Sequence, residues 1–273
     1  MQEKIDAPLG SVQKTLFLPL WGRAVEMEKE KPLLVDKTAR EVINRVNYDF
    51  SQIANNIHPL TRLAWIMRGI YTDSVIQDYI KEFPGGTIVN LGCGLDTSFE
   101  RNDNGILNWY ELDLPDVIAL RKKFFKENER RHLIAASVLD DEWVEKIEVK
   151  KNLLFIVAGL LYYLTEADVK KLFKRIADNF SSASIICDIS SPLGVSLSNK
   201  LVIKNTGLDE SSYLKWGIEN DKDIERWDSR YKIVRRFFYY RYRKLKIGLK
   251  MRFYGYMADR KRIQYMIFLR LGK

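Results

Sequence analysis

Short apolar runs that alternate with helical stretches constrain the fold of this chain more than any other feature. Between residues 87 and 189 the runs are TIVNL (87–91), LNWYEL (107–112), HLIAA (132–136), LLFIVA (153–158) and SIICDI (184–189). Helices are expected between them at 115–129, 141–147 and 165–179, the last opened by a capping box of Thr165 and Asp168. Strands that alternate with helices predict βαβ units, and continuous apolar strands predict a parallel sheet covered on both faces.

The two ends of the chain follow different patterns. Residues 1–82 are expected to be mostly helical and to end at the FPGG turn (83–86). Residues 190–230 break the rhythm and are interpreted as an insertion after the fifth strand. Two more strands, 231–240 and 263–271, are expected to flank a helix at 243–259. We therefore predict an α/β fold with a Rossmann-like seven-stranded sheet, in which an N-terminal helical extension (1–82) and a core (83–273) form one integrated domain.

Composition and charge narrow the class of protein. The chain has 273 residues, of which 46% are hydrophobic and 30% charged, as in an ordinary globular protein. No apolar run reaches the roughly 18–20 residues of a membrane span, and the start MQEKIDAPLG lacks the pattern of a secretory signal. Two cysteines imply no disulfide framework, so a cytoplasmic location is the default expectation. No metal site is predicted, and the sequence gives no indication of oligomeric state.

One stretch of the chain is strongly basic. The net charge is +9, and Arg230 to Arg252 contains ten Lys/Arg and no Asp/Glu. Such a patch can attract nucleic acid, an anionic membrane surface or acidic substrates, or it can be a solvated face. Interleaved aromatic side chains favour nucleic acid, but the same alternation describes a strand with one buried face. These side chains are Tyr231, Phe237, Phe238, Tyr239, Tyr240 and Tyr242.

A glycine turn directly after the first strand is the first candidate binding element. Gly92 and Gly94 allow a tight turn and a close ligand, at the sheet edge where ligands of α/β folds bind. The dinucleotide fingerprint G-x-G-x-x-G fails because its third glycine falls on Thr97. Asp96 would repel a pyrophosphate about 4 Å away by about 1–4 kcal/mol, which favours a phosphate-free, cationic cofactor such as S-adenosylmethionine. Capping of the following helix by Asp96–Thr97 is the structural alternative.

An acid at the end of the second strand is the second binding element. Asp113 is the last residue before the LP that opens the next helix, where it can accept hydrogen bonds from both ribose hydroxyls. Glu111 shares its strand parity and is the second choice. An ordinary strand-end acid is the alternative interpretation.

Three blocks in order carry a resemblance to a known family. LGCGLDTSFER (91–101), WYELDLPDVIALRKKF (109–124) and AGLLYYLTEADVKKLF (158–173) are similar to the leucine carboxyl methyltransferase and polyketide O-methyltransferase family. The bacterial tetracenomycin carboxyl O-methyltransferase-like branch is the nearer match, also through KTLFLPLWGRAVEMEKEKPLLVDKTAREV (14–42) and LKWGIENDKDIERWD (214–228). The resemblance implies a class I S-adenosylmethionine-dependent methyltransferase with an extra N-terminal helical region.

The resemblance also implies a cofactor site. In the family a lysine near the N-terminus and an Arg-Gly bind the cofactor's carboxylate, which by motif are Lys14 and Arg68. The leucine carboxyl methyltransferases have acids where this chain has Ala158 and Ser137, which weakens any expectation of a protein-tail leucine as substrate. The predicted cofactor-binding residues are Lys14, Arg68, Gly92, Cys93, Gly94, Asp96, Asp113, Leu114, Ser137, Val138, Ala158 and Gly159.

The expected reaction is transfer of a methyl group to oxygen. A carboxylate acceptor is ionised at neutral pH and needs no general base, whereas a phenol benefits from one. Candidate catalytic residues are Tyr162 and Tyr163, one lining the pocket and one packed in the core, and His58; His132 is interpreted as structural. We expect an O-methyltransferase of a small polyketide-like or aromatic acid or phenol, with a carboxylate favoured. A nucleic-acid methyltransferase and a non-catalytic S-adenosylmethionine-binding protein are the alternatives.

Overall fold

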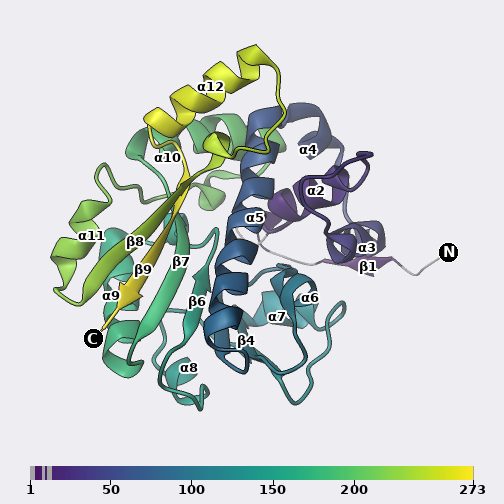
Figure 1. Cartoon of the computed structure of the whole chain (residues 1–273). Helices are drawn as coiled ribbons and strands as arrows, with labels where there is room; N and C mark the ends of the chain where they lie inside the picture. The colour runs from purple at the N-terminus through teal and green to yellow at the C-terminus, as the bar shows by residue number, and fades with distance from the viewer. Residues whose placement is uncertain (1–3, 8–9, 11–13, 273) are drawn as a thin grey trace.

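A seven-stranded sheet forms the centre of the computed structural model, which describes residues 4–7, 10 and 14–272 (Figure 1). The strand order is β5-β4-β3-β6-β7-β9-β8, and β9 runs antiparallel to both of its neighbours. The strands are β3 (Thr87–Leu91), β4 (Asn108–Asp113), β5 (Arg131–Ala135), β6 (Leu154–Val157), β7 (Ala183–Ile189), β8 (Tyr231–Phe238) and β9 (Tyr265–Leu271). The predicted α/β fold with a Rossmann-like seven-stranded sheet is confirmed.

Helices cover both faces of the sheet, as the apolar strands predict. On one face α8 (Glu142–Glu145), α9 (Glu166–Asn179) and α11 (Lys222–Trp227) share a core with β3, β4, β6 and β7. On the other face α5 (Pro59–Glu82) and α6 (Ser98–Asn102) pack on the opposite side of the same strands. The predicted capping box opens α9, since Thr165 Oγ1 accepts the N–H of Asp168 at 3.2 Å. Figure 1 shows α5 crossing the sheet along its whole height.

The N-terminal region adds a second helical layer against α5 and α6. It contains α2 (Phe17–Glu26), α3 (Lys37–Arg45) and α4 (Ser51–Asn56). The short parallel pair β1 (Ile5–Asp6) and β2 (Val46–Asn47) was not expected. Helix α5 shares a hydrophobic core with the sheet. Residues 59–82 therefore pack as an outer layer of the sheet, although they belong to the predicted N-terminal extension.

The segments between the last strands differ from the predicted pattern in detail. The insertion holds α10 (Pro192–Ser198), a π-helical turn (Asn199–Ile203), two 3₁₀ turns (Lys204–Thr206 and Glu210–Ser212) and α11. A 3₁₀ turn, η5 (Tyr239–Arg241), follows β8, and α12 (Leu249–Arg260) begins only after Gly248. Among the described residues, no helix is both long and apolar enough to cross a bilayer.

The helix after β4 is much shorter than predicted. Helix α7 covers Pro115–Arg121, and turns replace the rest of the expected 115–129 helix. The turn places the Phe125 ring 4.4 Å from the guanidinium carbon of Arg121 and 5.0 Å from that of Arg131. Arg121 and Phe125 lie at i and i+4, and the N–H of Phe125 still donates to the Arg121 carbonyl at 2.9 Å, so the turn keeps the two side chains on the same side.

Arg121 and Arg131 meet a single carboxylate inside the protein. Glu111 Oε2 accepts from Arg121 Nε at 3.0 Å and from Arg131 Nε at 2.9 Å, and Oε1 accepts from both guanidiniums as well. All three side chains are buried. Arg121 also donates to the carbonyls of Gly94 and Asp96 at 2.8 Å each. Glu111 is therefore a structural ion that holds Arg121 in place, and Arg121 holds the glycine turn.

We predict that Glu111→Gln destabilises the fold strongly, because, among the described residues, it leaves the buried guanidinium of Arg121 without a carboxylate partner and Arg131 with Glu100 alone. Removal of one partner from a buried ion pair costs about 3–5 kcal/mol. Chemical denaturation at neutral pH measures the change.

The matched control is Glu166→Gln, which removes the half-exposed partner of the Lys170 pair on α9. An exposed pair of this kind contributes about 0–1 kcal/mol. Equal unfolding free energies for the two variants would contradict the structural role of Glu111.

Candidate functional site

A cavity of about 350 Å³ lies at the carboxyl ends of the parallel strands. Its walls come from β3, β4 and β6, from α2 and α5 of the N-terminal region, and from the insertion. Thirteen of the fifteen residues predicted for the site line it. They are Arg68, Gly92, Cys93, Gly94, Asp96, Asp113, Leu114, Ser137, Val138, Ala158, Gly159, Tyr162 and Tyr163.

The glycine turn has the geometry that its sequence predicts. Gly92 and Gly94 adopt φ values of +67° and +49°, a region that side chains other than glycine rarely occupy. The N–H groups of Gly92 and Cys93 both donate to the carbonyl of Leu112, at 2.8 and 3.0 Å. The turn is thereby tied to the end of β4, directly beside Asp113.

Asp113 and Glu111 have separate roles despite their shared strand parity. Asp113 lines the cavity, where its carboxylate accepts the N–H groups of Gly94 at 2.7 Å and Leu114 at 2.8 Å. Burial raises the pKa of Asp113, and those two N–H groups offset the shift only in part. Glu111 does not line the cavity, and both of its carboxylate oxygens already accept hydrogen bonds from two guanidiniums. The structure thus leaves Asp113, and not Glu111, with oxygen lone pairs available to a ligand.

Asp96 lies at the opposite side of the turn. Its Oδ2 accepts from Asn90 Nδ2 at 3.0 Å and from the N–H of Ser98 at 3.2 Å, so it also supports the start of α6. Burial works to raise the pKa of Asp96, but the guanidiniums of Arg101 and Arg23 hold it below its usual value. The carboxylate is therefore ionised at neutral pH and gives this wall of the cavity a negative charge.

A second buried ion cluster attaches the N-terminal helices to the turn. Asp36 accepts from Arg23 Nε at 2.8 Å, from Arg101 Nη1 at 2.8 Å and from Thr97 Oγ1 at 2.6 Å. Arg101 reaches on to Asp73 of α5 at 2.8 Å. Burial works to raise the pKa of Asp36, but the two guanidiniums keep it lowered. These residues were not predicted, because their connection spans four separate segments of the chain.

At the other end of the cavity, Asp188 is the central hydrogen-bond acceptor. It is the next-to-last residue of β7. Arg68 Nη2 lies 2.6 Å from Asp188 Oδ2, and the N–H of Gly159 donates to Oδ1 at 2.6 Å. Gln264 Nε2 donates to the Tyr162 hydroxyl at 2.6 Å and to Asp188 at 3.2 Å. Asp188 and Gln264 were not predicted from the sequence. An acid near the end of the apolar run SIICDI was the available signal for Asp188.

Both tyrosines line the cavity, so the expectation that one of them packs away in the core is wrong. Tyr162 is buried beside Arg68 and Gln264, whereas the Tyr163 hydroxyl donates to Thr15 Oγ1 at 3.0 Å. Burial raises the pKa of both phenols, and for Tyr162 the charge of Asp188 raises it further. Both hydroxyls therefore stay protonated at neutral pH.

Ser137, Val138 and Ala158 form the wall beyond the ends of β5 and β6. The N–H of Ser137 donates to Asp140 at 3.0 Å, and its hydroxyl accepts the N–H of Leu139 at 3.1 Å. The Val138 carbonyl accepts from Arg175 at 2.9 Å. These contacts hold the segment in place and leave the small side chains of Ser137 and Ala158 at the cavity surface.

Two predicted site residues lie outside the cavity lining. Lys14 is half-buried and immediately precedes Thr15, which does line the cavity. His58 is exposed at the start of α5, where its Nδ1 accepts the N–H of Leu60 at 3.2 Å. This capping contact explains His58 structurally, and we do not retain it as a catalytic candidate. His132 stacks on Tyr110 with ring centroids 4.7 Å apart, in the structural role expected for it.

Comparison with known proteins agrees with this geometry. The family model described as leucine carboxyl methyltransferase matches residues 17–177. The tetracenomycin polyketide synthesis O-methyltransferase TcmP of Streptomyces glaucescens is 27% identical over 219 residues, which cover 80% of this chain and 79% of TcmP. The S-adenosyl-L-methionine-dependent methyltransferase dpfgK of Gibberella zeae is 25% identical over 241 residues, covering 82% and 80%.

Solved structures support the fold. A methyltransferase candidate from Thermobifida fusca superposes with a TM-score of 0.58 at 13% identity, covering 92% of this chain and 94% of its own. The plantazolicin methyltransferase BamL, solved with a triazolic analogue and SAH, superposes with a TM-score of 0.52 at 11% identity, covering 96% and 98%. The family match spans more than half of the chain and includes the glycine turn, Asp113 and the tyrosine pair. This chain belongs to the leucine carboxyl methyltransferase family and is a class I S-adenosylmethionine-dependent methyltransferase.

Proposed function

We propose that this protein is an O-methyltransferase that transfers a methyl group to the carboxylate of a small, largely apolar acid. The observation that carries the proposal is the chemistry of the cavity. Its described lining contains no histidine, and both of its tyrosines have raised pKa values. A carboxylate is already ionised at neutral pH, so it needs no proton acceptor, whereas a phenol does.

The residues at the turn fit the cofactor. S-adenosylmethionine supplies an electrophilic methyl carbon on a cationic sulfonium and carries no phosphate. Asp113 has lone pairs for its ribose hydroxyls, and the ionised Asp96 favours the cationic amino-acid end. Arg68 is a candidate for its carboxylate, because the guanidinium Nε is buried without a hydrogen-bond partner. Ser137 and Val138 are candidates for contact with adenine.

The wall nearest the insertion supports a small, apolar acceptor. Leu18, Trp65, Val202, Ile203 and Leu214 line the cavity and leave it mostly apolar. Tyr162 and Gln264 are polar residues of the same lining, which suits one acidic group on an apolar body. The name of TcmP, a polyketide O-methyltransferase at 27% identity, points to the same class. A polyketide-like or aromatic acid is therefore the proposed acceptor.

The structure weakens one argument for nucleic acid as the acceptor, namely the aromatic side chains of the basic stretch. Of the aromatic side chains in the basic stretch, Tyr231, Phe237 and Tyr239 are buried in the core and are unavailable for base stacking. The non-catalytic alternative is distinguished by turnover of S-adenosylmethionine with any acceptor. A cytoplasmic location stays a prediction.

We predict that Asp113→Ala weakens cofactor binding about 5- to 150-fold, the equivalent of about 1–3 kcal/mol for unpaired buried polar groups. Asp116→Ala is the matched control, since Asp116 is exposed on α7 and does not line the cavity. Calorimetric titration with S-adenosylhomocysteine measures both variants. Unchanged affinity in Asp113→Ala would remove Asp113 from the site.

We predict that Tyr162→Phe lowers kcat/KM about tenfold, chiefly through KM, because the hydroxyl, which Gln264 holds at 2.6 Å, orients the acceptor. Tyr163→Phe is the matched comparison and removes the hydroxyl that donates to Thr15. Loss of a general base would instead lower kcat by about 10²–10⁴. A loss of that size confined to Tyr162→Phe would show that the phenol transfers a proton.

The pH dependence of turnover distinguishes the acceptor classes. Because both phenol pKa values are raised, the tyrosines stay neutral as the pH rises through the assay range. With a carboxylic acid acceptor, of pKa about 4, kcat/KM is expected to be flat between about pH 6 and about pH 9. A panel of soluble aromatic acids and matching phenols tests this. Turnover of phenols alone, rising with pH, would overturn the carboxylate assignment.

A further inference from the structure

Helix α12 carries an exposed apolar ridge, which we define as Leu249, Phe253, Tyr254 and Tyr256. Leu249 is 87% exposed and Phe253 60%, and the two tyrosines are about half-exposed. Leu249, Phe253 and Tyr256 follow at i, i+4 and i+7, so they lie on one face of the helix. Helix α12 joins the end of β8 to the start of β9, and it therefore lies at the sheet edge that holds the cofactor cavity (Figure 1).

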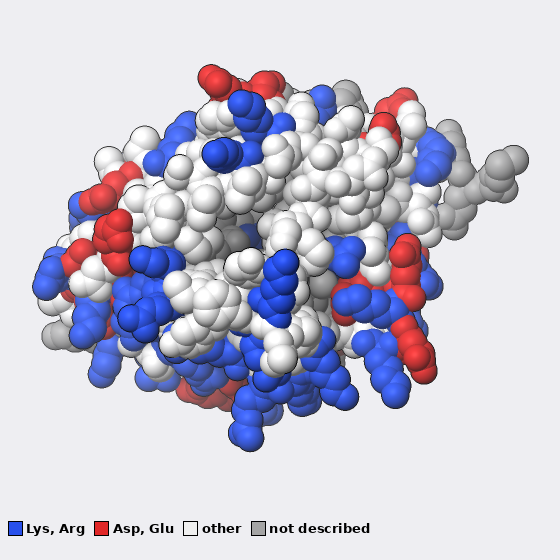
Figure 2. All heavy atoms as spheres, turned by 90° about the horizontal axis from the view of Figure 1, so that it is seen from above, with Lys and Arg blue, Asp and Glu red and all other residues white. Residues whose placement is uncertain are grey.

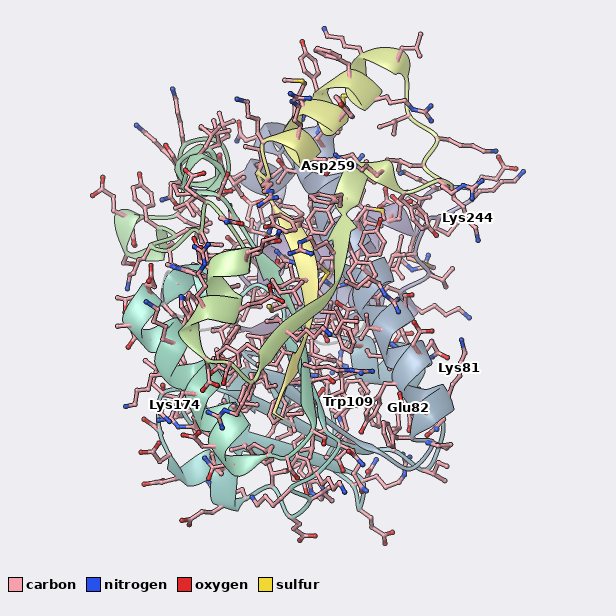
Figure 3. All side chains as sticks on the ribbon, turned by 60° about the vertical axis from the view of Figure 1, so that its left-hand side comes forward. Lys81, Glu82, Trp109, Lys174, Lys244 and Asp259 are labelled. Atoms are coloured by element: carbon pink, nitrogen blue, oxygen red, sulfur yellow. The ribbon has the colours of Figure 1, made fainter. Side chains whose placement is uncertain are left out.

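The opposite face of α12 is fixed to the protein. A Cβ on Gly255 would lie 2.8 Å from Cβ of Tyr240, so the helix backbone packs directly on that side chain. The N–H of Tyr240 donates to Asp259 at 3.1 Å, and Asp259 lies on the side of α12 that faces the body of the protein (Figure 3). The tyrosine hydroxyl in turn donates to the carbonyl of Leu60 at 2.9 Å. The ridge is thus the outer face of an anchored helix.

The basic stretch divides into a paired half and an unpaired half. Arg230, directly before β8, and Arg235 and Arg236 on β8 have carboxylate partners within 3.2 Å, whereas Lys232 on β8 has no ion pair within the described part of the chain. Among the described residues, none of the cations closest to the ridge has an ion-pair partner; these are Arg243, Lys244, Lys246, Lys250 and Arg252. Figure 2, which looks onto the top of the molecule where α12 lies, shows Lys and Arg gathered around uncoloured side chains. The unpaired positive charge therefore lies just before α12 and in its first turn, at the end of the ridge that holds Leu249.

A second cavity, of about 360 Å³, opens beside the ridge. Its walls are Tyr240, Arg241, Tyr242, Arg243, Leu245, Arg252 and Tyr256. The three guanidiniums and the hydroxyls of Tyr242 and Tyr256 form a set of hydrogen-bond donors suited to phosphate oxygens, whereas the Tyr240 hydroxyl already donates to the carbonyl of Leu60. Tyr256 belongs both to the ridge and to the wall of this cavity. A phosphate bound in the cavity would therefore lie next to the ridge.

We propose that α12 and residues 241–248 form a docking surface for an anionic lipid membrane. The ridge would enter the boundary between headgroups and acyl chains, the cavity would hold a headgroup phosphate, and the lysines would face the negative surface. An anchored helix with protruding apolar side chains fits a deformable bilayer without a complementary groove. Nucleic acid would use the cations and tyrosines but would gain nothing from burial of Leu249.

Vesicle sedimentation with the full chain tests the proposal. We expect binding to vesicles of equal parts phosphatidylglycerol and phosphatidylcholine, and none to phosphatidylcholine alone. Leu249→Ala with Phe253→Ala should lower the partition coefficient roughly tenfold by removing apolar area. A change from about 0.1 M to about 1 M salt shortens the Debye length from about 10 Å to about 3 Å and should release most of the protein.

A charge-matched pair of variants separates local from overall charge. Lys244→Gln with Lys250→Gln should weaken binding about 30-fold, at about 1 kcal/mol for each cation near the surface. Lys81→Gln with Lys174→Gln removes the same charge from α5 and α9, away from α12 (Figure 3), and should bind as the unaltered protein does. All substituted side chains are exposed, and equal thermal midpoints verify the folds.

Three outcomes would overturn the proposal. The first is an absence of binding to the anionic vesicles. The second is equal binding of the two lysine variants, or unaltered binding of the Leu249 and Phe253 variant. The third is salt-sensitive retention of single-stranded RNA, under conditions where the vesicles do not bind, which would assign the surface to nucleic acid.

Discussion

The contact between Arg121 and the carbonyls of Gly94 and Asp96 is the interaction on which the site depends. It places the buried guanidinium of Arg121 behind the glycine turn. The carboxylate of Glu111, which also pairs with Arg131, compensates the charge of this guanidinium. A turn with two glycines at positive φ is intrinsically flexible, so its shape must be set from outside. The buried ions set it before any ligand arrives, which is the form of preorganisation that a binding site needs.

The cavity has two ends with different chemistry, and each is held by its own buried ions. At the turn, Asp113 and Asp96 present carboxylates whose remaining lone pairs face the ligand. At the far end, Asp188 joins Arg68, Gly159 and Gln264 into one network beside Tyr162. Carboxylates at the turn suit the ribose hydroxyls and the ammonium group of the cofactor. At the other end Arg68 suits the cofactor's carboxylate, and Tyr162 lies on the side proposed for the acceptor. The proposed direction of cofactor and acceptor follows from this asymmetry.

The sequence predicted well those features that depend on neighbouring residues. Strand β3 was predicted at its observed bounds, and thirteen of the predicted site residues meet at the cavity. Local signals at strand ends and turns indicated the glycine turn, Asp96 and Asp113, whereas the family resemblance implied Arg68, Ser137 and Ala158. Features that depend on distant partners were missed. Glu111, named as the second choice for the ribose acid, is instead paired with Arg121 and Arg131 from two other segments. The capping contact of His58 with Leu60 is local, but histidine is not among the usual capping residues.

The same limit explains the basic stretch and the unpredicted ions. Arg235 and Arg236 are paired by Asp78 and Asp221, which lie far away in the sequence, so composition alone could not separate neutralised from free cations. Asp36 and Asp188 depend likewise on partners from other segments. Composition correctly located the positive charge, but only the fold shows which part of it remains unpaired.

The most direct test of the central claim is a crystal structure with S-adenosylhomocysteine bound. We expect ribose hydroxyls within hydrogen-bond distance of Asp113, roughly 2.6–3.2 Å, and open space between the sulfur and Tyr162 for an acceptor. A nucleoside bound away from the glycine turn, or a sulfur facing away from Tyr162, would contradict it.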